Sequence, residues 1–171
     1  MTTSSSDSPA NTIYTDLDHE LSTTRRMLER FPTGHNDWRP HEKSMTLGRL
    51  AAHVAELPGF GTMIINTDGM DFSKREYVAK IYDTADELLA VFDEKVEALR
   101  PVLAAADSAT LASLWTLRNG EQIFFTRPKG ELVRGMMINH LVHHRAQLGV
   151  YYRMLGVPVP GSYGPSADEP M

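Results

Sequence analysis

The sequence predicts an all-α protein folded as an antiparallel four-helix bundle. Apolar residues recur at intervals of three and four along four long segments, the connections between these segments differ in length, and strand signals are weak. The chain has 171 residues, 42% of them hydrophobic, which is enough for one domain with one core. We assign residues 12–158 to the bundle, residues 1–11 to a mobile N-terminal arm and residues 159–171 to an extended C-terminal tail.

The first two helices are predicted at residues 12–31 and from Thr46 onward. The first has an apolar stripe along one face. At the start of the second, the hydroxyl of Ser44 or Thr46 can cap the helix, and apolar residues then repeat at helical spacing as far as Leu57. Pro58 interrupts or ends this helix, although the apolar residues up to Ile65 allow a continuation.

The last two helices are predicted at residues 83–106 and 129–155. Acidic residues fill the first turn of the third helix, where they favour a helix start, and Gly156 stops the fourth. Between them, residues 114–117 and 122–125 flank an Asn-Gly pair, which resembles a β-hairpin.

Composition excludes several classes of function. The chain has no cysteine, so it cannot form a disulfide, a cysteine zinc finger, an iron–sulfur cluster or a catalytic thiolate. Its net charge is −5 and its basic residues are not clustered, which argues against a nucleic-acid partner. It has neither a signal peptide nor an apolar run long enough to span a membrane, so we expect a cytoplasmic protein with no membrane partner.

Three histidines are predicted to face one another inside the bundle. His140 and His144 are four residues apart on the last helix, so their side chains leave the same face. That face also carries the apolar residues of the helix and therefore points inward. His53 lies on an apolar, inward row of the second helix. Neighbouring His143 lies about 100° around the helix from His144 and is expected to point elsewhere.

A divalent cation would satisfy three imidazoles that meet in this way. Buried imidazoles need hydrogen-bond partners, and a shared ion accepts their lone pairs. Three histidine ligands with an open fourth position are typical of catalytic zinc sites. The alternative is that the three histidines are ordinary core residues with separate hydrogen-bond partners.

The sequence also resembles the DinB-like metal-binding superfamily. The resemblance spans residues 12–169 and rests on four stretches: Asn139–Leu148 followed by Tyr152–Gly156, Leu47–Glu56, Trp38–Pro40 and Tyr163–Glu169. One position departs from the pattern, since many members have glycine where this chain has Ala146. Alanine is the better helix former by about 1 kcal/mol, so we interpret it as a neutral variant.

The resemblance implies a four-helix bundle that holds one divalent metal ion, most often zinc or nickel, through His53, His140 and His144. Related families on this scaffold use the metal to activate a low-molecular-weight thiol. We therefore expect a metal-dependent transferase that uses an external thiol, or a metal-dependent hydrolase, with a small-molecule substrate. The alternatives are a non-catalytic metal-binding stress-response protein and a plain helical dimer. A homodimer is expected in any of these cases.

Further side chains are candidates for supporting the site. Metal-bound histidines normally donate their second N–H to an oxygen, which makes Asn139, Gln147 and Glu56 candidate partners, with Gln147 and Glu56 preferred. Arg145 could bind an anionic substrate or the carboxylate of a thiol, and a salt bridge within the bundle or across a dimer is an equal alternative. We take Arg145 and Gln147 as candidate cofactor-binding residues and assign no catalytic residue.

Overall fold

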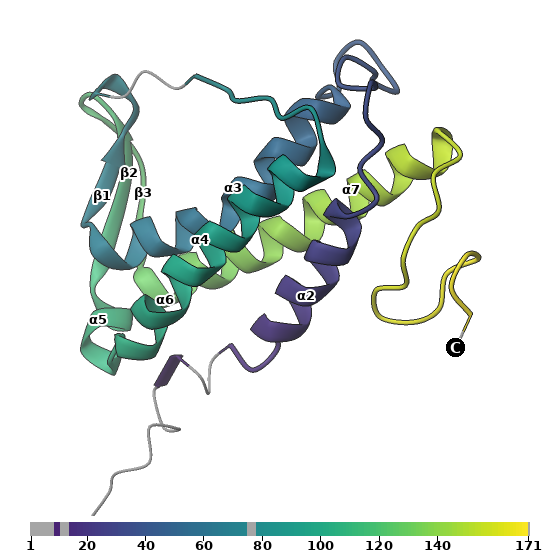
Figure 1. The fold of residues 1–171 in the computed structure, drawn as a ribbon. Coiled ribbons are helices and arrows are strands. Elements are labelled where there is room, and N and C mark those ends of the chain that lie inside the picture. Colours follow the sequence, from purple (N-terminus) through teal and green to yellow (C-terminus); the bar gives the residue numbers. More distant parts are fainter. Residues whose placement is uncertain (1–8, 11–13, 75–77, 171) are drawn as a thin grey trace, which may run out of the picture.

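The structure is a computed structural model that describes residues 9–10, 14–74 and 78–170 (Figure 1). Most of the predicted N-terminal arm therefore lies outside the described residues. Ala10 is described, and it is buried against the core residues at the sheet end of the molecule. This residue belongs to the packed domain rather than to a free arm.

Four long helical segments form the body of the protein, as the apolar spacing predicts. They are α2 (Leu17–Leu28), α3 (Leu47–Asn66), α4 (Ala85–Ala105) and a last segment made of α6 (Lys129–Leu132), the π-helical turn η2 (Val133–Asn139) and α7 (His140–Met154). The Thr46 and Thr84 side chains cap α3 and α4 by accepting hydrogen bonds from backbone N–H groups. A short helix, α5 (Ser108–Ala112), follows α4.

Helix α3 continues through Pro58 and does not end there. Proline lacks a backbone N–H and costs about 3 kcal/mol inside a helix. Pro58 is itself buried, and the next two turns bury Gly61, Ile64 and Ile65. The burial of apolar residues on both sides of the proline offsets its cost, which explains why the helix continues instead of ending at Pro58.

The expectation of a purely all-α fold is wrong, because the helices are joined to a three-stranded sheet. Strands β1 (Gly69–Asp71), β2 (Leu114–Asn119) and β3 (Gln122–Pro128) lie in that order, with β1 parallel and β3 antiparallel to β2. The hairpin is confirmed, and Gly120 in its turn has φ 59°, a left-handed conformation that favours glycine. The fully buried Trp115 attaches the sheet to the helices.

The expectation of antiparallel neighbours throughout is also wrong. Helices α3 and α7 are antiparallel, since His53 meets His140 while Gly61 lies against Met137. Helices α3 and α4 are parallel, because Gly59 lies against Lys95 and Gly61 against Leu99. After α3 the chain enters β1 and then returns along the molecule, so that α4 starts at the same end as α3 (Figure 1). A long crossover of this kind replaces the short loop that antiparallel neighbours require.

The C-terminal tail has no helix or strand from Val157 to Pro170, and it lies along α2 and the end of α7. Glu169 pairs with Arg26 and Arg30, and Asp168 pairs with Arg153 at 2.6 Å. No described helix is both long enough and apolar enough to cross a membrane.

Candidate metal centre

Three imidazoles converge between α3 and α7, which confirms the predicted meeting of His53, His140 and His144. Nε2 of His140 lies 2.8 Å from Nε2 of His144 and 3.4 Å from Nε2 of His53. One donor atom from each of the three residues can be chosen so that all lie within 4.8 Å of one another. His144 is buried and the other two are partly buried.

The second nitrogens of two rings are held by oxygens. Nδ1 of His144 is 2.7 Å from Oε1 of Gln147, and Nδ1 of His140 is 3.3 Å from the backbone oxygen of Met136. Because these oxygens only accept, both Nδ1 atoms carry the proton and donate. Both Nε2 atoms then present lone pairs to each other at 2.8 Å, an arrangement that is repulsive unless a cation lies between them.

The spacing of the nitrogens fits a small divalent ion. Two nitrogens each about 2.05 Å from one ion are about 3.3 Å apart at a tetrahedral angle and about 2.9 Å apart at a right angle. The observed separations of 3.4 and 2.8 Å lie at these two values. These two separations therefore fit one metal ion held by the three residues.

The three rings are neutral at pH 7, which is the form that binds metal. The pKa of His53 is lowered to about 3, mainly by burial and to a smaller extent by the neighbouring His144 and His140. Burial also lowers the pKa values of His140 and His144. A metal ion would therefore displace no proton from these nitrogens near neutral pH.

The π-helical turn η2 leads directly into His140, and it was not predicted from the sequence. The backbone N–H of His140 donates to Met137, while its ring donates to the carbonyl of Met136. Single π turns often occur at functional sites, where they change the direction of a side chain. Here the turn supplies a backbone oxygen that orients a ligand, a role that residue identity does not reveal.

The other candidate residues have separate places. The side chain of Arg145 is 2% exposed and forms an ion pair with Glu20 at 2.7 Å. This is the salt bridge within the bundle that the sequence analysis gave as one alternative for Arg145. Its second nitrogen donates to Oη of Tyr163, which in turn donates to Glu20. The binding role of Arg145 stays a prediction, and this ion pair argues against it. Asn139 and His143 are exposed.

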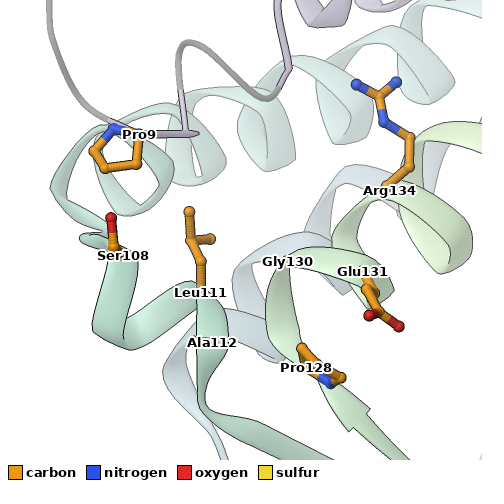
Figure 2. Close-up of a pocket in the computed structure, with 8 residues that line it drawn as sticks. All are labelled: Pro9, Ser108, Leu111, Ala112, Pro128, Gly130, Glu131 and Arg134. Carbon is orange, nitrogen blue, oxygen red and sulfur yellow. The ribbon is translucent and has the colours of Figure 1, made fainter.

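Glu56 lies one turn after His53 but faces a different feature. It lines a cavity of about 650 Å³ between α3 and α4, where burial and, after it, the charge of Glu56 raise the pKa of Tyr82. A further cavity of about 470 Å³ lies where α5 approaches α6 (Figure 2). Its lining residues are Pro9, Ser108, Leu111, Ala112, Pro128, Gly130, Glu131 and Arg134. Neither cavity is lined by the three histidines.

Comparisons with known proteins agree with this architecture. YrdA, an uncharacterized protein of Bacillus subtilis strain 168, is 28% identical over 168 residues, which cover 92% of this chain and 93% of the relative. A DinB-like protein from Bacillus cereus ATCC 10987 superposes with a TM-score of 0.62 at 23% identity, covering 88% of this chain and 95% of that one. The DinB-like protein YjoA from Bacillus subtilis gives a TM-score of 0.64 at 19% identity, covering 86% and 96%. The DinB family model matches residues 1–170. With this match over almost its whole length, the chain belongs to the DinB family.

Proposed function

We propose that the protein binds one divalent metal ion, zinc or nickel, through His53, His140 and His144. In this proposal the remaining coordination position binds a small molecule, and the protein acts as a metal-dependent thiol transferase or hydrolase. The observation that carries the proposal is the convergence of three Nε2 atoms from α3 and α7, with two of the rings oriented through Nδ1.

The chain's own residues have two tasks in this function. Met136 and Gln147 fix the ring orientation and the tautomer of His140 and His144, which directs both lone pairs to one point. A divalent ion held there would lower the pKa of a bound thiol or water, which is how it would supply a nucleophile. Since the chain has no cysteine, a sulfur nucleophile must come from a separate small molecule.

Metal analysis tests the binding part of the proposal. Untagged protein is loaded separately with zinc and with nickel, dialysed and measured by elemental analysis, with about one ion per chain expected. His53→Ala and His140→Ala are expected to lose the ion. His143→Ala, on the same helix but exposed, is the matched control and is expected to keep it. Unchanged metal content in His53→Ala would contradict the shared site.

A substrate panel tests the catalytic part. Metal-loaded protein is assayed with low-molecular-weight thiols and electrophiles, and separately with esters and amides. Turnover that requires metal and disappears in His140→Ala supports the enzyme. Bound metal that raises the melting temperature without any turnover supports the alternative, a non-catalytic metal-binding protein.

A further inference from the structure

Arg49 lies on the same face of α3 as His53, one turn earlier in the helix. Residues four apart on a helix have Cβ atoms about 5–6 Å apart and point to the same side. His53 uses this side to meet α7. Arg49 therefore extends from the face of α3 that forms the candidate metal centre.

Two contacts between the α3 region and α7 show which turn of α7 lies opposite Arg49. His53 meets His140 and His144, and Met45 accepts a hydrogen bond of 3.2 Å from Tyr151. Because α3 and α7 are antiparallel, a residue halfway between Met45 and His53 lies opposite the turn that contains Gln147. Arg49 and Gln147 thus border the centre on the same side.

The charge of Arg49 acts on the centre. Its guanidinium carries a positive charge at the border of the centre, four residues before His53 on the same face of α3. An ion held by three neutral imidazoles keeps its full double charge. A guanidinium beside it adds to the positive potential of the open side, where it raises the affinity for an anion.

We propose that Arg49 selects an anionic ligand for the open position of the metal centre. The ligand would carry a thiolate or a carboxylate that contacts the metal ion and the guanidinium together. This inference rests on the proposed metal site and narrows its substrate class to small anions. Arg49 is a specificity-determining residue in this role and does not itself bind the ion.

Cobalt-loaded protein allows a test that does not depend on turnover. The visible absorption of bound Co²⁺ changes when a ligand enters its coordination sphere, so it reports binding of azide, an anion, and of imidazole, a neutral ligand. Arg49→Gln is expected to weaken azide binding by at least about tenfold and to leave imidazole binding unchanged. Arg49→Lys keeps the charge and is expected to stay within about threefold of the unaltered protein for azide.

Arg153→Gln is the matched control, since it removes one positive charge from the exposed end of α7, where Arg153 pairs with Asp168. It is expected to bind azide as the unaltered protein does. Unchanged azide binding in Arg49→Gln overturns the inference. Equal weakening of azide and imidazole, or an equal loss in Arg49→Lys and Arg49→Gln, also overturns it, because the role is then structural. If the unaltered protein binds no Co²⁺, the proposed metal site itself fails.

Discussion

Replacing Arg145 with methionine is expected to destabilise the fold by about 3–5 kcal/mol. The side chains of Arg145 and Glu20 are 2% and 5% exposed, and their charged groups are 2.7 Å apart. Removing the arginine leaves a buried carboxylate whose remaining side-chain partner is the hydroxyl of Tyr163 at 2.8 Å. That hydrogen bond offsets part of the loss, so we expect a value near the lower bound.

Urea unfolding at pH 7, followed by circular dichroism, measures this loss, and the melting temperature should fall by about 6–12 °C. Arg145→Met combined with Glu20→Gln removes both charges and is expected to recover much of the stability. Both proteins should still bind metal, since Arg145 faces α2 and not the three histidines. A loss below about 1 kcal/mol, or a stable variant that no longer binds a small anion, would refute this reasoning and favour a binding role for Arg145.

Three further predictions concern the centre and the sheet. Gln147→Leu is expected to weaken metal binding by about 10–100-fold in a competition titration with a chelator, while the fold stays intact, because His144 loses its orienting oxygen. The metal-free protein is expected to lose stability as the pH falls from 6.5 towards 3. The pKa of His53 is about 3 in the folded state, so the unfolded chain binds more protons over this range. His53 changes the free energy of unfolding by at most about 1.4 kcal/mol per pH unit, and by less than this because its ring is partly exposed to water. Urea unfolding at several pH values should show a weaker pH dependence in His53→Gln. Gly120→Val is expected to cost about 1–3 kcal/mol in thermal unfolding, since valine is strained at a φ of 59°.

The helices could be predicted because their signals are local. Apolar spacing and the caps at Thr46 and Thr84 depend on neighbours within a few residues. The hairpin was also visible, in the glycine of its turn. Strand β1 was not, because Gly69–Asp71 is only three residues long and is a strand only through its pairing with β2. The parallel order of α3 and α4 depends on the long connection that follows β1, and no local pattern predicted it.

In the candidate site, too, local sequence patterns predicted some features and could not predict others. The spacing of His140 and His144 fixes their common face, and the spacing of Gln147 from His144 fixes their hydrogen bond. His53 was found because its row on α3 is apolar. The carbonyl of Met136 was missed because every residue has one, and only the π-helical register directs this one to an imidazole. The partner of Arg145 is Glu20, 125 residues away, and no local pattern connects them.

Helix α7 is fixed on two sides at consecutive residues. His144 faces α3 and Arg145 faces α2, about 100° apart around the helix axis. On the α2 side the buried ion pair is complete within the protein chain. On the α3 side the Nε2 atoms of His140 and His144 lie 2.8 Å apart, and both carry lone pairs. These lone pairs repel each other unless a cation lies between them. A metal ion would therefore join α3 to α7 as the Arg145–Glu20 pair joins α2 to α7. Because the two contacts share one rigid helix, we expect the stability gained from metal to be smaller in Arg145→Met, where α7 is no longer held on its second side.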